Sequence, residues 1–436
     1  MGKKLSLIDN RFFWWQLLLF NVSIAGYVYL ASISKKIHAF EFIMLITLEF
    51  FIYFLSLYII TKQNKVVSLV NFSHKYNFSL IVIYIILIRI ISITADPIFE
   101  NDFFRYHWDA KVWASQINPY YYPPDNFFLE HLRDANWSQV TFKNVSTIYP
   151  PFSQFIFRIA YEISPNNTYV LKVILMVFEM LTIYVLYKWL DLKKLPKNLI
   201  LLYSANPLVI KEFANSAHID AVLIFFIVSM LYFFAKEKKY LVALFWGLAI
   251  LTKLWPIIFT SLFIRYFNFK HYLLGLVIVV LGYLPFIGAG ELLFEGLITF
   301  SQFWQFNSSI HQVISYVSSE TASKIIAVVI TIGLSLKLGL SKKRDLKIND
   351  FQVLLGVFLL LGPVVNTWYI VWLLPFLVLS FQPSILLLSF TSTFSYFYYW
   401  QNQDLWWIRT IEYTPFYLLV TWQAYKENKK SFFMKK

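Results

Sequence analysis

The sequence predicts an all-α polytopic membrane protein, and three observations support this prediction. Of the 436 residues, 58% are hydrophobic and only 14% are charged, whereas soluble domains carry about 25% charged residues. The apolar residues form runs of about 20, the length that crosses a bilayer as a helix. Basic residues stand at the ends of these runs, so membrane topology explains the net charge of +14 better than nucleic-acid binding does. A single soluble enzyme, a disordered protein and a disulfide scaffold are excluded.

The first apolar run follows Lys3, Lys4 and Arg11, and it is longer than the apolar core of a cleaved signal, about 7–15 residues. We therefore interpret it as the first of about 12 to 14 membrane crossings. One later run is short, and another is interrupted at Lys253. A polar break at membrane depth is tolerated where the backbone lines a cavity, so the run interrupted at Lys253 is predicted to form two half-length helices. The expected spans are Phe12–Ser32, Phe40–Ile60, Phe78–Thr94, Tyr169–Leu190, Asn198–Ala214, Ala217–Ala235, the interrupted Tyr240–Tyr266, Tyr272–Gly288, Thr321–Leu340, the short Phe351–Leu361, Thr367–Ser380, Ser384–Trp400 and Tyr413–Tyr425.

The distribution of Lys and Arg predicts the orientation of these spans. With the N-terminus in the cytoplasm, most basic residues fall on the cytoplasmic side, as the positive-inside rule requires. The C-terminus is then cytoplasmic, and the loops Ala95–Thr168 and Ala289–Glu320 are external. We expect one integral membrane domain over residues 1–436, in which the long first loop carries the chemistry.

The long loop contains a predicted helix from Asp102 to Gln116, which Asn118-Pro119 ends. On this helix Asp102, Arg105, Tyr106 and Asp109 stand at i, i+3, i+4 and i+7 and form one polar stripe. An interfacial amphipathic helix whose charges face water is one interpretation of this stripe. The residues that lie largely off the stripe, and could rest on the membrane interface or the helix bundle, are Phe103, Phe104, Trp108 and Val112.

A catalytic interpretation is favoured by the acidic residues around this helix. Asp96, Glu100, Asp102 and Asp109 lie close together in the sequence beside a membrane span. Carboxylates that crowd near a low-dielectric boundary have perturbed protonation and can serve as bases. An alcohol acceptor needs such a base because its hydroxyl is a poor nucleophile until a proton is removed.

The run Glu100-Asn-Asp102-Phe-Phe-Arg105-Tyr106-His-Trp108-Asp109-Ala110, followed by Asn118-Pro119-Tyr120 and Tyr122-Pro-Pro, resembles the first-loop signature of GT-C glycosyltransferases. It is most similar to bacterial multi-pass mannosyltransferases, which read roughly D-x-x-R-Y-x-W-D-G…G-x-N-P-Y…P-P. Ala110 and Gln116 stand where glycine is usual, which affects the helix end and not the acids. The similarity continues at Tyr149-Pro-Pro, Asn215-Ser-Ala-His218-Ile-Asp220, Lys253-Leu-Trp-Pro256 and Asn366-Thr-Trp368-Tyr369.

This resemblance implies a GT-C-like bundle that transfers a sugar with inversion from a polyprenyl-phosphate donor to a glycan or lipid-linked acceptor. The reaction would take place at the external face of a bacterial cytoplasmic membrane, with mannose as the family's sugar, and without nucleic acid as a partner. Residue by residue, Asp102 matches the general base, and Glu100 with Asp102 forms the E-x-D variant of the paired-acid motif. Arg105 joins them as a catalytic candidate. The matching positions expected to bind substrate are Tyr106, Trp108, Asp109, Asn118, Tyr120, His218, Asp220, His311, Trp368 and Tyr369.

Lys253 is the strongest candidate for binding the donor phosphate, ahead of Arg105 and His311. A charge at membrane depth is costly and is functional by default, although a lysine can also extend to the surface. A fixed cation would stabilise the negative charge that develops on the leaving phosphate. The alternatives for His218 and Asp220 are ordinary interfacial residues, and the aromatic segment Phe300–Tyr316 is expected to form an interfacial helix.

No cofactor and no obligatory metal are expected. No set of His, Asp and Glu has the spacing of a metal site, and a phosphomonoester donor does not require the metal clamp that a nucleotide diphosphate does. The alternative function is a lipid-linked-sugar flippase or transporter. Such proteins often contain inverted repeats and midplane charges, whereas here we find no repeat and the acids gather on one loop. This distribution favours an enzyme.

Overall fold

The structure is a computed structural model that describes residues 2–67, 74–165, 167, 169–342, 345–401 and 405–433. Within these residues the secondary structure is helical throughout, apart from one isolated bridge between Phe306 and Val364. The loop boundary Thr168 and the basic residues Lys343 and Arg344, used in the topology argument, lie outside the described residues. The predicted all-α polytopic fold is confirmed.

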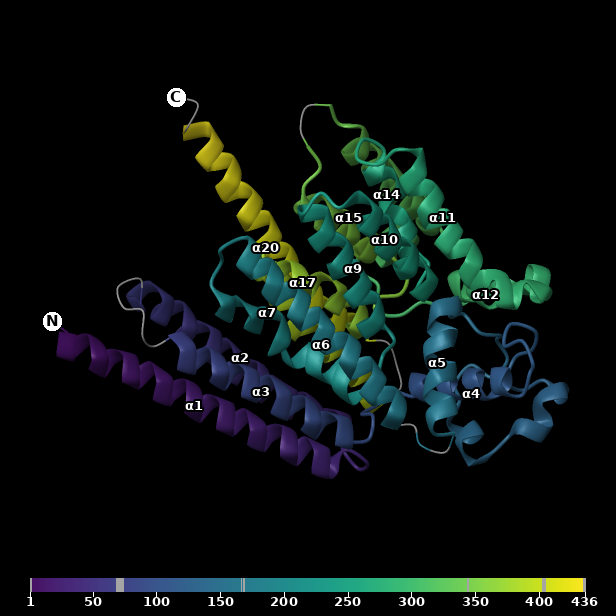
Figure 1. The fold of residues 1–436 in the computed structure, drawn as a ribbon, viewed down its shortest axis with the longest axis horizontal. Coiled ribbons are helices and arrows are strands. Elements are labelled where there is room, and N and C mark those ends of the chain that lie inside the picture. Colours follow the sequence, from purple (N-terminus) through teal and green to yellow (C-terminus); the bar gives the residue numbers. More distant parts are fainter. Residues whose placement is uncertain are drawn as a thin grey trace.

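Long apolar helices run side by side along one half of the molecule (Figure 1). Five helices within the described residues are long and apolar enough to cross a membrane, and large side chains such as Phe51 and Val329 are exposed on them, as lipid contact requires. The helices that lie side by side are α1 (Gly2–Ile33), α2 (Ala39–Val67), α3 (His74–Thr94) and α6 (Tyr169–Leu192). Buried Arg89 of α3 and Glu179 of α6 pair at 2.6 Å and join these two helices.

The long loop is an ordered unit at the opposite end of the molecule from the termini (Figure 1). Its predicted helix is confirmed but ends at Ala114, and it packs on α5. The interpretation of this helix as an interfacial one with charges facing water is wrong, because Arg105, Tyr106 and Asp109 are buried. The loop elements are α4 (Asp102–Ala114), η1 (Phe127–Leu132), η2 (Ala135–Gln139) and α5 (Pro151–Ile163).

The chain after α6 does not cross the molecule as the single helix expected for Asn198–Ala214. Asn206-Pro207 interrupts it, because proline cannot donate the backbone hydrogen bond that a continuing helix needs. A π-helical turn then carries Lys211 and Glu212 into the protein interior. The pieces are η3 (Lys197–Ile200), α7 (Leu201–Ser204), α8 (Pro207–Val209), the π-helix η4 (Ile210–Asn215) and the continuous α9 (Asp220–Ala235).

The break predicted at Lys253 is confirmed, since this residue has extended backbone angles between two helices. The expected single helix Phe300–Tyr316 is wrong: one helix ends at Phe303, and the next begins at Ile310 after Asn307, whose φ is positive. The elements are α10 (Lys239–Thr252), η5 (Trp255–Phe263), α11 (Phe269–Tyr283), η6 (Leu284–Phe294), α12 (Glu295–Phe303), α13 (Ile310–Val317), α14 (Glu320–Leu340) and α15 (Ile348–Leu361).

The C-terminal part is also more broken than expected. The runs predicted as spans Thr367–Ser380 and Ser384–Trp400 are each divided into short α- and 3-10-helical pieces. The total of about 12 to 14 crossings therefore stays a prediction. The pieces are α16 (Thr367–Ile370), η7 (Val371–Leu373), α17 (Leu374–Leu377), α18 (Pro383–Thr391), η8 (Ser392–Phe397), α19 (Tyr398–Gln401) and the long α20 (Trp406–Phe433).

Candidate active site

The segment that leads into α4 is held against the π-helix. The Asn215 side chain accepts a hydrogen bond from the Ile98 amide and donates one to the Asp96 carbonyl, each 2.9 Å long. Phe99 has a φ of 61°, a conformation that is uncommon for a residue with a side chain. The following residue, Glu100, is thereby turned into the protein, where its side chain is buried.

A second unusual backbone position lies in the facing segment. Ala217 has a φ of 60°, and the amide of His218 donates to the carbonyl of Glu212 at 3.1 Å. This turn returns the chain toward the π-helix before α9 begins. Strained residues of this kind occur preferentially at functional sites, where the surrounding packing holds them. Here two of them aim Glu100 and His218 at the same point.

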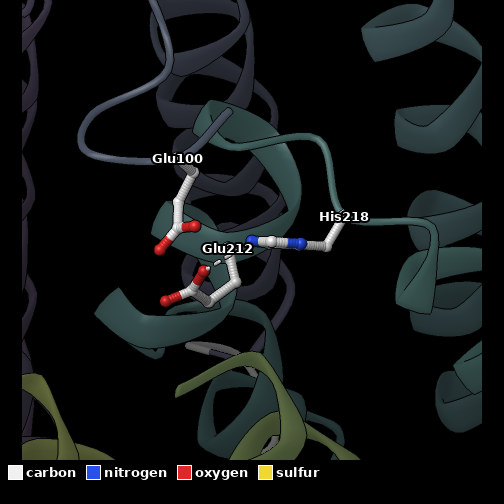
Figure 2. A group of neighbouring side chains, drawn as sticks. All are labelled: Glu100, Glu212 and His218. Carbon is white, nitrogen blue, oxygen red and sulfur yellow. Dashed lines mark ion pairs between the residues drawn. The ribbon is translucent and has the colours of Figure 1, made fainter. Parts of the chain in front are cut away.

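Glu100, Glu212 and His218, which we call the Glu–His cluster, point toward one another (Figure 2). One ligand-type atom from each lies within 4.8 Å of the others. Nε2 of His218 lies 3.3 Å from Oε2 of Glu212, and the imidazole stacks on the indole of Trp368 with ring centroids 3.9 Å apart. The cluster joins the segment before α4, the π-helix and the turn before α9.

Lys211 places a positive charge beside both carboxylates of this cluster. Its Nζ lies 3.6 Å from Oε1 of Glu100 and 3.5 Å from Oε2 of Glu212. Nζ also donates to the hydroxyl of Tyr396 and lies 4.2 Å from the centroid of that ring. Thr367 Oγ1 and the Tyr396 hydroxyl donate to Oε1 of Glu212 at 2.6 and 2.5 Å. Both oxygens of the Glu212 carboxylate therefore have partners within the site.

Asp102 lies beside the cluster, and its side chain is more accessible than those of Glu100 and Glu212. Its Oδ2 lies 3.7 Å from Nδ1 of His218 and accepts a hydrogen bond of 3.5 Å from the Tyr149 hydroxyl. The Asp102 side chain is 25% exposed, against 7% for Glu100 and 0% for Glu212. A substrate can thus reach Asp102 more readily than the other two.

Burial changes the proton affinity of Glu100. Desolvation raises the pKa of this carboxyl to about 7, although the positive charges of Lys211 and His218 act in the opposite direction. A carboxyl with such a pKa can also exchange a proton near neutral pH. Glu100 is therefore a chemical rival of Asp102, and access to substrate distinguishes the two.

Lys253 forms the other side of the site, at the break between α10 and η5. Its Nζ pairs with Oδ1 of Asp220 at 2.9 Å and lies 4.8 Å from the ring centroid of Tyr369. The Trp372 indole donates to the same Asp220 oxygen at 2.6 Å. Lys253 is linked to Asp102 through neighbouring residues, because His218, 3.7 Å from Asp102, stacks on Trp368, and Trp368 precedes Tyr369. Asp102 and Lys253 therefore border the same group of residues.

Residues 57–267 match the model of the MptA/B family, described as the N-terminal domain of alpha-(1->6)-mannopyranosyltransferase. This segment is similar to that mannosyltransferase domain. It contains the whole Glu–His cluster together with Asp102, Lys211 and Lys253, and the predicted resemblance to membrane mannosyltransferases is confirmed. No curated protein and no solved structure matches the chain.

The structure brings together part of the set that the sequence singled out. Seven predicted residues meet at the site. Glu212 and Lys211 were not predicted, since they were taken as part of an apolar span; two charges inside such a run were the signal that could have revealed them. The predicted residues that meet at the site are Glu100, Asp102, His218, Asp220, Lys253, Trp368 and Tyr369.

Arg105 and Asp109 form a buried ion pair within α4. Nε of Arg105 pairs with Oδ1 of Asp109 at 2.8 Å, one helical turn away, and both are buried. Arg105 also donates to the Phe142 carbonyl at 3.3 Å, which ties α4 to the rest of the loop. Tyr106 stacks on Phe157 of α5 with centroids 4.4 Å apart. These contacts show that Arg105 holds the fold of the loop, and its catalytic role stays a prediction.

The remaining predicted residues also form structural contacts. Trp108 lies in a small apolar core within the loop. The Asn118 side chain donates to the Phe286 carbonyl at 3.0 Å, and the Tyr120 hydroxyl donates to the Tyr149 carbonyl at 2.7 Å. His311 is buried and hydrogen-bonded to Ser323 of α14 at 2.8 Å. These four residues form contacts that shape the loops around the site, and their expected substrate contacts stay predictions.

Proposed function

We propose that this mannosyltransferase moves mannose from a polyprenyl-phosphate donor to a hydroxyl of a glycan or lipid-linked acceptor, with inversion. The reaction takes place at the external face of a bacterial cytoplasmic membrane. The observation that carries the proposal is that an accessible carboxylate of the loop and a lysine at a helix break border one group of residues. Asp102 lies 3.7 Å from His218, which stacks on Trp368, and Lys253 lies 4.8 Å from the ring of the next residue, Tyr369. In one displacement reaction, Asp102 would accept the proton of the attacking hydroxyl and Lys253 would stabilise the leaving phosphate.

Asp102 serves as the general base. Its carboxylate takes the proton of the acceptor hydroxyl while that oxygen forms a bond to C1 of the sugar. The bond between C1 and the phosphate oxygen breaks, and the lipid phosphate leaves with the electron pair. Attack on the face opposite to the phosphate inverts C1. Tyr149, whose hydroxyl contacts Oδ2 of Asp102 at 3.5 Å, orients the carboxylate.

Lys253 stabilises the charge that develops on the leaving phosphate. Asp220 and the rings of Tyr369 and Trp372 fix the ammonium in place, so little reorganisation is needed when the donor binds. The pairing with Asp220 also explains how a lysine is accommodated at a break in a membrane helix. The reaction in this proposal uses no cofactor and no obligatory metal.

The proposal is tested with purified protein in detergent. Polyprenyl-phosphate mannose carrying a labelled sugar is supplied with a membrane lipid extract as acceptor, and GDP-mannose replaces it in a parallel reaction. We expect label transfer from the lipid donor alone, and no transfer with the Asp102→Asn variant. Transfer from GDP-mannose in the absence of the lipid donor contradicts the proposed donor class.

A further inference from the structure

The Glu–His cluster has the ligand chemistry of a zinc site. Zinc is bound by His nitrogens at 2.0–2.1 Å and carboxylate oxygens at about 2.0–2.2 Å, in tetrahedral geometry. Two neighbouring ligand atoms of such a site are about 3.4 Å apart, and Nε2 of His218 lies 3.3 Å from Oε2 of Glu212. The His218 side chain is completely buried, and both ring nitrogens face carboxylates, Nε2 that of Glu212 and Nδ1 that of Asp102.

A positive charge already contacts both carboxylates of this cluster. The Lys211 ammonium lies 3.6 Å from Glu100 and 3.5 Å from Glu212, and its side chain is only 3% exposed. Tyr396 fixes it from the far side by accepting a hydrogen bond and presenting its ring. A divalent ion bound by the same carboxylates would be repelled at short range by this ammonium in a buried site.

We propose that Lys211 is the resident cation of the Glu–His cluster and takes the place of a divalent metal. Its removal leaves two buried carboxylates without their cation, and the cluster then becomes a zinc site. The inference concerns the proposed active site, but it does not depend on the sugar or the donor. Its readout is metal binding, so it can fail while the proposed transfer holds, and the reverse is also possible.

The experiment measures zinc content and thermal stability of the full chain in detergent, after dialysis against a chelator and then against Zn²⁺. We expect wild-type protein to retain no stoichiometric zinc and to melt at the same temperature with and without chelator. Lys211→Met is expected to bind about one Zn²⁺ per chain. It should melt at a lower temperature than wild type without zinc and recover when zinc is added, because a ligand that binds only the folded state stabilises it.

Two matched variants control for the charge and for the ligands. Lys211→Arg keeps a cation and should bind no zinc, whereas Lys211→Met combined with His218→Ala should lose at least about tenfold in zinc affinity relative to Lys211→Met alone. One zinc per wild-type chain, with stability lost on chelation, overturns the proposal, as does folded Lys211→Met that binds no zinc. If Lys211→Met does not fold, metal-free wild-type protein whose melting is unaffected by chelator supports the proposal.

Discussion

Three of the carboxylates at the site, those of Glu100, Asp102 and Glu212, lie close to His218, and their surroundings differ. Glu212 accepts hydrogen bonds from Thr367 and Tyr396 and is fully buried, so it has no room for a substrate proton. Glu100 faces Lys211. Asp102 stands at the start of α4, where the helix dipole favours a negative charge, and it remains partly exposed. The position of Asp102 is therefore the one suited to a base.

Asp102→Asn preserves the shape of the side chain and removes the base. We expect transfer to fall by about 10²–10⁴-fold, the range that general-base catalysis contributes, while donor binding is retained. Single-turnover rates and donor affinity, both measured on purified protein, check this. Glu100→Gln is the matched control and should retain more activity than Asp102→Asn. Near-normal turnover of Asp102→Asn, together with loss in Glu100→Gln, would assign the base to Glu100.

Lys253→Ala tests the binding of the donor phosphate. A hydrogen bond to a charged group contributes about 1.5–3 kcal/mol, so we expect kcat/KM for the donor to fall by about 10- to 100-fold. Lys253→Arg should recover part of the loss. Lys111→Ala removes another paired lysine, which contacts Asp134 at 2.7 Å in the long loop, and should leave kcat/KM for the donor unchanged. If the Lys253 and Lys111 variants impair the enzyme equally, the loss comes from the change in overall charge and not from a contact between Lys253 and the donor phosphate.

At the scale of elements, interruptions of helices build the site. The break at Asn206-Pro207 precedes the π-helix that presents Lys211 and Glu212. The break at Lys253 frees this residue from the helix, and a further break after Gly362 precedes the short helix that begins at Thr367. Backbone that leaves helical geometry at membrane depth is tolerated where it lines a cavity or is buried in protein. The concentration of such breaks around one cluster is itself a sign of function.

Helix α4 depends on the buried pair of Arg105 and Asp109 for its position. Arg105→Met leaves Asp109 uncompensated, and breaking a buried ion pair costs about 3–5 kcal/mol. We expect a lower melting temperature and faster amide hydrogen exchange in α4. Arg105→Met combined with Asp109→Leu should restore much of the stability. A stable Arg105→Met protein with strongly reduced kcat would instead return Arg105 to the catalytic group.

At the scale of the whole molecule, the sequence predicted the membrane class, α4 and the break at Lys253, because apolar runs, helix-compatible stretches and charges at membrane depth are local signals. It did not predict that Arg105 and Asp109 pair inside the loop or that Lys211 joins Glu100. These contacts depend on how distant segments pack. The apolar run around Pro207 was interpreted as one span because composition alone does not distinguish a crossing from a segment that turns within the protein.

The positions of the two chain termini relative to the long loop make the orientation of the protein in the membrane testable. The start of α1 and the end of α20 lie toward one side of the molecule in Figure 1, and α4, α5 and α12 lie toward the other. The bias of Lys and Arg then predicts cytoplasmic termini and an external site. The chain has no cysteine, so single cysteines can be introduced directly at Glu130 of η1 and at Lys193 beyond α6, both exposed.

We expect an impermeant thiol reagent to label Glu130→Cys in intact cells and Lys193→Cys only after the membrane is opened. Labelling is quantified against a fully permeabilised sample of each variant, so that differences in expression cancel. The reverse pattern would place the loop in the cytoplasm, where a donor presented at the external face could not reach Asp102. Because Asp102 and Lys253 border the same group of residues, this single measurement tests the side of the membrane on which both groups of the proposed reaction work.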